Sequence, residues 1–359
     1  MGSNPQESLT LTLENPMKPA YLSLATALLL APAVPALAEG QLNIFNFGLY
    51  TPPDLITKFE KAYDVKVTLT EYDSNETAMA KIEAGGHGFD IVVPSASVVP
   101  IYIEKGLLMQ SEPAQMENFK NVDPAWVDVS WDSGRHYTVP WVWGTTGVMV
   151  NTNVYKGDIN TSAIFLDPPE ELKGKINVVP SMTDVIDMAI RYVGGEPCTS
   201  DKAVLKAARD KLMAAKPSWA SIDYASFEKF INEDLNASVF WSGAANRIRE
   251  QNPHFAYGYP KEGYSLWQDN VAILADATNV ENAKLFLNFI MDPENAALIS
   301  NYTRYGNAIL GSDAFMDPAL PNAPEMVVPE ELKAAGYFQQ TCPAEVQEIY
   351  TRIWTDLTK

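Results

Sequence analysis

The chain has 359 residues, which is longer than one compact core usually supports and predicts two domains or lobes. It carries 26 Lys and Arg against 45 Asp and Glu, a net charge of −19. Because such a charge repels phosphate backbones and anionic lipids, it argues against nucleic acid as a partner and favours a cationic one.

A signal-peptide pattern precedes the globular part of the chain. We place the start at Met17, after which Lys18 supplies a positive charge and residues 20–31 form an apolar stretch. The tripeptide Ala-Leu-Ala then matches a cleavage site, with the cut expected after Ala38. Residues 1–16 lie upstream of that start and are left out of the fold. No later apolar stretch reaches the length of a membrane span, so we predict a periplasmic protein of a Gram-negative host.

After the cleavage site, strand and helix patterns alternate along the chain. In order, the expected elements are strand 42–47, helix 53–63, strand 65–70, helix 75–84 and strand 89–94. Asn75 is the predicted N-cap of the second helix. Such alternation is typical of a mainly parallel sheet that is covered by helices on both faces.

The remainder of the chain continues this pattern. We expect helices near 182–193, 201–215 and 224–234, strands near 237–241, 255–259 and 270–275, and helices over 279–291 and 344–357. Ligands of such sheets lie beyond the carboxyl ends of strands. This rule directs attention to the strand-end residues 47–50, 94–97, 241–242 and 267–269.

Cys198 and Cys342 are the two cysteines of the chain. In an oxidising compartment an even pair is more typical of a disulfide than of a metal or catalytic site. We therefore predict a Cys198–Cys342 bridge, with two free thiols as the alternative.

The sequence carries no catalytic signature. Its three histidines, His87, His136 and His254, are scattered, and the common hydrolase, metalloprotease and phosphate-loop motifs do not occur. No cluster of His, Cys or carboxylates has the spacing of metal ligands. We expect no catalytic residue, no metal and no cofactor.

The stretch YSLWQDNVAIL (264–274) places Trp267 two residues before Asp269 inside an apolar strand. Side chains at i and i+2 share one face of a strand, so the indole and the carboxylate point the same way. A buried carboxylate needs a cation, hydrogen bonds or water, and a ligand ammonium would supply the cation while the indole adds a cation–π contact. Two alternatives remain: core filling by the Trp, and pairing of Asp269 with Lys261 or Arg304.

Five motifs, in this order, resemble the periplasmic spermidine/putrescine-binding proteins of bacterial ABC importers: NFGLYTPPDLITKFEKAYDVKV, YDSNETAMAKI, FDIVVPS, VPWVWGTTGVMVN and LWQDNVAI. The resemblance runs from about residue 42 to the C-terminus. It implies an α/β, two-lobed periplasmic binding protein fold of type II, in which each lobe has a central, mostly parallel sheet flanked by helices. We assign 39–147 and 270–307 to the first lobe, and 148–269 and 308–359 to the second.

The resemblance also implies a polyamine held in the cleft between the lobes by an aromatic box and acidic residues. The implied ligand-binding residues are Phe47, Tyr50, Ser95, Ser181, Asp184, Trp241, Trp267, Asp269, Tyr305 and Gln339. Several positions depart from the family pattern: Phe47 replaces a Trp, Gly48 a Ser or Thr, Ser97 an aromatic residue, and Ser181 and Ala244 replace acids.

We therefore predict a periplasmic monomer that captures putrescine, spermidine or a similar polyamine and delivers it to an ABC permease in the inner membrane. Its lobes would close by rotation on hinge strands near 145–150 and 268–272. Two anionic anchors, Asp184 and Asp269, suit a diamine, but they also suit a monoamine or a ligand with its own carboxylate. Another small amine, a quaternary ammonium compound, an amino-acid derivative, ferric iron or an exported enzyme are the open alternatives.

Overall fold

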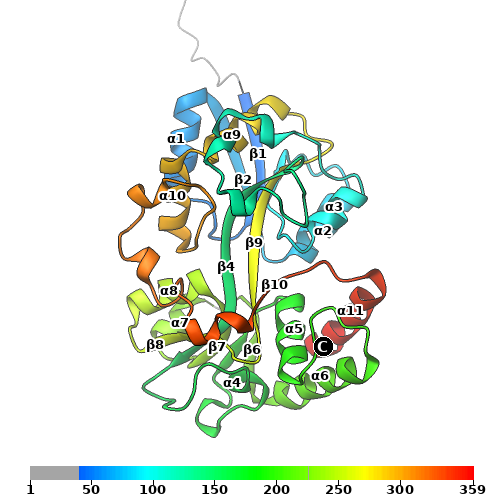
Figure 1. Ribbon diagram of the computed structural model, residues 1–359, viewed down its shortest axis with the longest axis vertical. Helices are drawn as coiled ribbons and strands as arrows, with labels where there is room; N and C mark the ends of the chain where they lie inside the picture. The colour runs from blue at the N-terminus through cyan, green and yellow to red at the C-terminus, as the bar shows by residue number, and fades with distance from the viewer. Residues whose placement is uncertain (1–39, 225) are drawn as a thin grey trace, which may run out of the picture. The chain divides into compact units, whose positions relative to one another are not determined.

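The computed structural model describes residues 40–224 and 226–359 (Figure 1). The predicted signal peptide, with its cut after Ala38, lies outside these residues. In the described part, helices and strands alternate along the chain in an α/β fold. None of the helices in that part is long and apolar enough to cross a membrane.

The strands of the described part form one ten-stranded sheet. Neighbours follow the order β2-β1-β3-β9-β4-β7-β5-β6, with β10 beside β9 and β8 beside β4. The strands are β1 (Gly40–Phe47), β2 (Val65–Tyr72), β3 (Ile91–Val92), β4 (Thr138–Asn151), β5 (Ile176–Val178), β6 (Trp219–Ile222), β7 (Ala237–Trp241), β8 (Phe255–Gly258), β9 (Tyr264–Ile273) and β10 (Gly336–Phe338). β1 pairs in parallel with β2 and β3, and β5 pairs in parallel with β6 and β7. The long β4 and β9 pair antiparallel with each other.

Helices flank this sheet. They are α1 (Pro53–Tyr63), α2 (Asn75–Glu83), α3 (Val99–Glu104), α4 (Ala163–Leu166), α5 (Met182–Tyr192), α6 (Lys202–Ala215), α7 (Phe227–Ile231), α8 (Ser242–Gln251), α9 (Val280–Ile290), α10 (Pro293–Thr303) and α11 (Ala344–Thr358). Figure 1 shows α1, α2, α3, α9 and α10 around β1 and β2, and α4 to α8 with α11 around the other end of β4.

Separate hydrophobic cores mark two lobes within the described residues. In the first lobe, Ile44 of β1 packs with residues of α1 and α9 on one sheet face, and Phe45 packs with residues of α2 and α3 on the other. In the second lobe, Val148 and Phe240 share one core with residues of α5, α6 and α11. The two-lobed α/β fold is confirmed.

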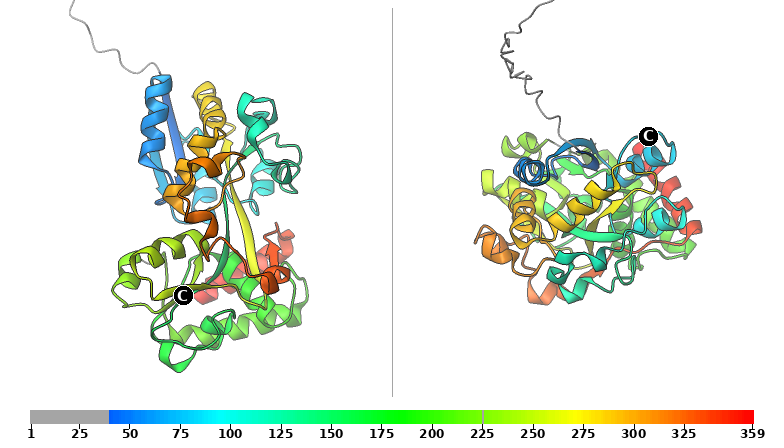
Figure 2. Two further views of the ribbon diagram at one scale, coloured as in Figure 1. Left: turned by 60° about the vertical axis from the view of Figure 1, so that its left-hand side comes forward. Right: turned by 90° about the horizontal axis from the view of Figure 1, so that it is seen from above.

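The strands β4 and β9 run through both lobes. Figures 1 and 2 show them side by side, and their register pairs Thr138 with Ala272 and Thr146 with Ser265. The predicted lobe boundaries, 147/148 and 269/270, fall inside these continuous strands. The exact boundaries remain a prediction, because each of these two strands contains residues of both lobes.

Local signals explain where some elements begin and end. α1 begins at Pro53, in the first turn, where proline's missing amide hydrogen costs no helical hydrogen bond. The prediction that Asn75 caps α2 is wrong, because the Ser74 hydroxyl accepts the hydrogen bond from the Thr77 amide. Asn75 is instead the first residue of that helix.

Three predicted elements have a different length. The strand predicted at 89–94 forms ladder pairs only over β3, and it meets Pro94, which has no amide hydrogen to donate. The helix predicted at 224–234 is the shorter α7, which ends before Glu233 takes a left-handed φ of 60°. The strand predicted at 270–275 begins at Tyr264, where pairing with β4 and β10 extends it.

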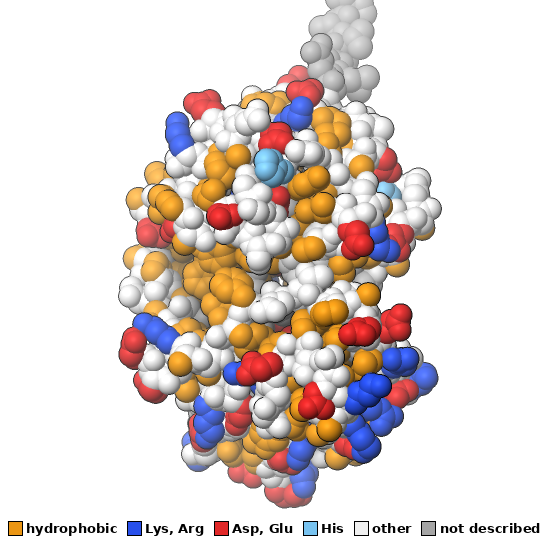
Figure 3. Space-filling model, turned by 45° about the vertical axis from the view of Figure 1, so that its right-hand side comes forward, with side chains coloured by type: hydrophobic (Ala, Val, Ile, Leu, Met, Phe, Trp, Pro, Cys, Tyr) orange, Lys and Arg blue, Asp and Glu red, His pale blue; other side chains and the backbone are white. Residues whose placement is uncertain are grey.

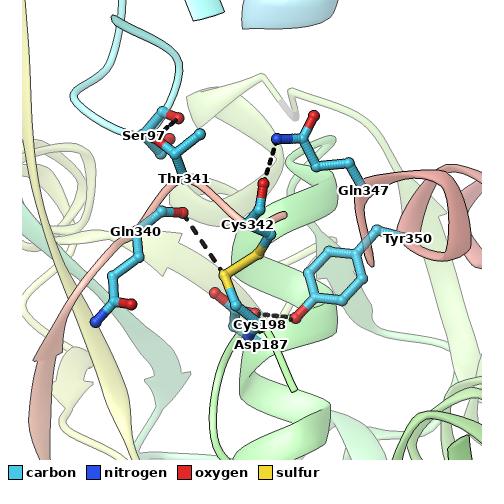
Figure 4. The surroundings of a disulfide bond; sticks show 8 residues. All are labelled: Ser97, Asp187, Cys198, Gln340, Thr341, Cys342, Gln347 and Tyr350. Atoms are coloured by element: carbon cyan, nitrogen blue, oxygen red, sulfur yellow. Dashed lines mark hydrogen bonds between the residues drawn. A yellow bond between two sulfur atoms is a disulfide. The ribbon is translucent and has the colours of Figure 1, made fainter. Parts of the chain in front are cut away.

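Cys198 and Cys342 form the disulfide that the sequence predicted (Figure 4). The bridge joins the loop after α5 to the segment that precedes α11. Beside it, the Tyr350 hydroxyl donates a hydrogen bond to Asp187 Oδ1 at 2.7 Å. These contacts fix α11 to α5, and the segment with Gln339 leads directly into them.

The double substitution Cys198→Ser and Cys342→Ser is expected to lower the free energy of unfolding by about 2–5 kcal/mol, because the bridge joins residues 144 positions apart and restricts the unfolded chain. Urea unfolding of the variant and of the oxidised wild type measures the difference. Wild type treated with a thiol reductant should match the variant. Equal unfolding free energies for the variant and the oxidised protein would contradict this stabilisation.

Candidate functional site

A cavity with a volume of about 180 Å³ lies between the two lobes, beside β4 and β9. All ten side chains that the sequence predicted as ligand contacts line it. They are Phe47, Tyr50, Ser95, Ser181, Asp184, Trp241, Trp267, Asp269, Tyr305 and Gln339. Their meeting in one cavity is a structural finding, while their contacts with a ligand remain a prediction.

The Asp269 carboxylate is buried in the wall of this cavity, with 4% of the residue exposed. The Ser95 hydroxyl donates to Oδ1 at 2.6 Å, and the Tyr50 hydroxyl donates to Oδ2 at 2.5 Å. Each carboxylate oxygen has two lone pairs, so each can accept one further hydrogen bond. The carboxylate can therefore receive an ammonium without losing either hydroxyl.

Burial raises the pKa of Asp269 from its ordinary value of 3.8 to about 6, against the two hydrogen bonds, which lower it. The negative charge of Asp184 raises this pKa further. A positive ligand group beside Asp269 would oppose both effects and lower this pKa.

Lys261 and Arg304, the alternative partners suggested for Asp269, are engaged elsewhere. Lys261 Nζ lies 2.9 Å from Asp158 Oδ2. Arg304 forms ion pairs with Glu250 at 3.0 Å and with Asp317 at 2.9 Å. The alternative of a native cation at Asp269 is therefore wrong for both residues.

The pleat of β9 confirms that Trp267 and Asp269 share one face, since both line the cavity. Gln268 and Asn270, which flank Asp269, accept hydrogen bonds from the fully buried Arg135 guanidinium at 2.8 and 2.7 Å. Arg135 thus holds the strand from the side opposite to the cavity.

Ser95 is fixed by Asn75, which the sequence placed in a capping role. Asn75 Nδ2 donates to Ser95 Oγ at 3.0 Å, and Ser95 N donates to Asn75 Oδ1 at 3.1 Å. Because the Ser95 oxygen accepts from Asn75, its own hydrogen is directed to Asp269. The sequence missed this supporting role of Asn75.

Aromatic rings surround Asp269. Tyr305 lies edge-on to Trp267 with ring centroids 5.0 Å apart and edge-on to Tyr50 at 5.9 Å. Two glycines permit this packing: a Cβ on Gly144 would lie 2.7 Å from the Trp267 ring, and one on Gly243 would lie 2.6 Å from the Tyr305 ring. Gly144 occurs in the quoted VPWVWGTTGVMVN motif, but no sequence pattern revealed the role of either glycine.

Asp184, in the first turn of α5, forms the second acidic group of the cavity. Three side chains donate to its Oδ1: Thr146 at 2.8 Å, Ser265 at 2.9 Å and Gln339 at 2.5 Å. The Trp241 indole donates to Oδ2 at 3.1 Å. All four donors are neutral, so they satisfy the carboxylate without neutralising its charge.

A hydrogen-bonded relay connects the two halves of the cavity wall. The Trp267 indole donates to Thr146 Oγ1 at 3.1 Å, and that hydroxyl donates in turn to Asp184. Trp241 also lies against Tyr224, with ring centroids 5.6 Å apart. Thr146 therefore links the Trp267 ring to the Asp184 carboxylate, and Trp241 is held by its own hydrogen bond to the same carboxylate.

Several cavity residues were not foreseen as ligand contacts. Tyr72, Asp73, Glu76, Tyr224 and Arg247 line the cavity. Asp73 and Glu76 lie within the quoted YDSNETAMAKI motif. The sequence offered a signal for Arg247 as a cavity residue. In the helix that follows Trp241, residues 243 and 247 lie one turn apart on a single face.

Metal binding finds no support in the described part of the chain, where no group of three or more His, Cys, Asp or Glu residues could hold an ion. The arrangement offers a buried carboxylate, aromatic faces and neutral donors. Such a set binds an amine and its hydrocarbon chain.

Comparisons with known proteins agree with this chemistry. Residues 54–328 match the profile of the family described as bacterial extracellular solute-binding protein. The putrescine-binding periplasmic protein SpuD of Pseudomonas aeruginosa is 30% identical over 357 residues, which cover 92% of this chain and 96% of that protein. The spermidine/putrescine-binding periplasmic protein of Escherichia coli is 28% identical over 318 residues, with coverage of 88% and 91%.

Solved structures show the same fold. A putative spermidine/putrescine ABC transporter protein from Listeria monocytogenes superposes with a TM-score of 0.82 and 31% identity, covering 89% of this chain and 98% of that one. The names of these relatives are those of binding and transport proteins.

The raised pKa of Asp269 predicts a pH dependence of stability. The folded protein holds the Asp269 proton more tightly than the unfolded chain does, so its free energy of unfolding should fall by about 2 kcal/mol as the pH rises from about 4 to about 6.5. Asp269→Asn removes this contribution, and urea unfolding across that pH range measures it.

Asp187, whose pKa burial raises to about 7, contributes in the same direction. The informative quantity is therefore the difference between wild type and Asp269→Asn at each pH. A difference that stays constant from pH 4 to 6.5 would show that Asp269 does not titrate in this range.

Proposed function

Because this chain belongs to the bacterial extracellular solute-binding protein family, we propose that it binds a polyamine of the putrescine or spermidine type and delivers it to an ABC importer. The observation that carries the proposal is the buried Asp269 carboxylate. Among the described residues it has two hydroxyl donors and no cationic side chain within ion-pair distance. A ligand ammonium is the group that completes this site.

The cavity supplies a distinct interaction for each part of a polyamine. Asp269 accepts charge-assisted hydrogen bonds from one ammonium, in a setting with little competing water. The faces of Trp267 and Trp241 lie beside the methylene chain, and a cation over an aromatic face gains about 0.5–2 kcal/mol. Asp184, whose four hydrogen-bond donors are all neutral, is the partner for the second ammonium.

Ligand capture requires that the lobes move relative to each other. We assign residues 39–147 with 270–307 to one moving body and 148–269 with 308–359 to the other, with β4 and β9 as the hinge. Thr341 Oγ1, of the second body, donates to the carbonyl of Ser97, of the first, at 2.6 Å (Figure 4). Contacts of this kind would hold the closed state around the ligand.

The proposal includes where the protein works and what it does not do. It is exported by the signal peptide, with the cut after Ala38, and acts as a periplasmic monomer that presents its ligand to a permease in the inner membrane. It binds without making or breaking a bond. The names of its relatives, which are periplasmic binding proteins, support this assignment.

A thermal-shift panel tests the ligand class. Putrescine and spermidine are expected to raise the melting temperature of the purified protein by mass action, whereas glycine betaine and 4-aminobutyrate should have smaller effects. A shift produced by anionic compounds alone, or by the betaine alone, would refute the polyamine proposal.

Asp269→Asn is expected to weaken putrescine binding by about 1–3 kcal/mol, because the charged acceptor becomes neutral while its shape is kept. Isothermal titration calorimetry at pH 7.5 measures the dissociation constant. Asp313→Asn, which removes the same charge from an exposed aspartate that does not line the cavity, is the matched control. An Asp269→Asn protein that binds putrescine like the control would exclude Asp269 as the anchor.

A further inference from the structure

Phe338 ends β10, and its neighbour Gln339 points into the cavity. β10 pairs in parallel with β9, so that Phe338 lies opposite Leu266, and the Gln339 amide donates to the Leu266 carbonyl at 2.9 Å. Gln339 lines the cavity, as does Trp267, and its side-chain amide donates to Asp184 Oδ1 at 2.5 Å. Because side chains alternate along an extended chain, Phe338 projects from the face of β9 opposite to the cavity.

On that reverse face, the Phe338 ring contacts two tryptophans. Its centroid lies 5.7 Å from the Trp126 ring, in an edge-on arrangement, and 6.1 Å from the Trp131 ring. Phe338 is 41% exposed, so burial alone does not hold it. Figure 3 shows hydrophobic side chains at the level where the two lobes meet. The two indoles therefore limit where the Phe338 ring can lie.

The two tryptophans are anchored by Arg135. Its Nε donates to the Trp126 carbonyl at 2.9 Å, and its guanidinium lies 5.7 Å from the Trp131 ring centroid. The Trp131 indole also donates to Asn270 Oδ1 at 3.3 Å, and the Trp126 ring stacks on Trp143 with centroids 6.1 Å apart. Because Arg135 is fully buried, both rings belong to a fixed surface.

The contact of Phe338 with this surface joins the two lobes. Trp126 packs against the core of the first lobe. Ala335, directly before β10, packs against the core of the second lobe. The Cys198–Cys342 bridge then ties the segment after β10 to the loop that follows α5. The second lobe therefore holds the backbone of β10, while the first lobe holds the side chain at its end.

We propose that Phe338 is a positioning residue that holds Gln339 at Asp184. It acts from the reverse face of β9, through its contacts with Trp126 and Trp131. This inference rests on the proposed polyamine function and deepens it, because it makes the site of the second ammonium depend on how the lobes are arranged. A rotation that separates Phe338 from the tryptophans releases the end of β10 and, with it, the Gln339 side chain. Asp184 then keeps all its donors only while the lobes hold this arrangement.

Isothermal titration with putrescine tests this role. Phe338→Ala removes the ring but changes no residue that lines the cavity. Its dissociation constant should be about three to ten times that of the wild type, the factor that an aromatic pair contributes. Phe338→Tyr, which keeps an aromatic ring, should bind like the wild type. Phe315→Ala, the matched control, removes a phenylalanine that is 53% exposed and lies outside β10 and the cavity, and should also bind like the wild type.

A double-mutant cycle separates positioning of Gln339 from a general effect on the fold. In Gln339→Ala, which has no side-chain amide for Asp184, adding Phe338→Ala should change the dissociation constant by less than about twofold. The same small change is expected when Phe338→Ala is added to a protein with Trp126→Ala and Trp131→Ala, because the partner rings are already gone. Phe338→Leu, which keeps apolar bulk without a ring, replaces the Ala variant if that protein does not fold.

The possible failures are distinguishable. A Phe338→Ala protein that binds putrescine like the wild type overturns the positioning role and leaves the polyamine function standing. So does a loss of affinity that is equally large in the wild type and in Gln339→Ala. A wild type that binds neither putrescine nor spermidine overturns both proposals.

Discussion

The Asp269 carboxylate is buried between two lobes, and the described part of the chain satisfies it with the hydroxyls of Tyr50 and Ser95 and with no cation. Burial of an unpaired charge is unfavourable, and burial raises the pKa of Asp269 to about 6, against the two hydrogen bonds that lower it. Under the proposed function, a ligand ammonium would offset that cost of burial, which would favour the binding of a cation.

The position of this acid places it on a strand that is common to both lobes. Asp269 lies on β9, which together with β4 runs through both lobes, and Arg135 holds the neighbouring residues Gln268 and Asn270 from the opposite face. A cation bound at Asp269 would therefore act on one of the two strands that we propose as the hinge. The same strand carries Ser265, a donor to Asp184, so both acidic groups depend on one backbone segment.

The two acidic groups, Asp184 and Asp269, differ in the number of hydrogen bonds that their carboxylates accept. Asp184 has four neutral donors from separate parts of the chain, and these hydrogen bonds hold the cavity wall together. Asp269 has two donors and one open lone pair on each oxygen. Arg247 is the single Lys or Arg among the described residues that line the same cavity.

The sequence by itself determined the alternation of strands and helices, the disulfide, and the common face of Trp267 and Asp269, because these follow from local periodicity and from a choice of one cysteine pair. The resemblance named ten of the residues that line the cavity. Only the tertiary structure decided that Lys261 and Arg304 pair elsewhere, that Asn75 supports Ser95, that Gly144 and Gly243 admit the rings, and that Arg247 faces the cavity. These contacts join residues that are distant in the chain. Whether two such side chains meet depends on how the elements pack in three dimensions, and the order of residues alone does not reveal it.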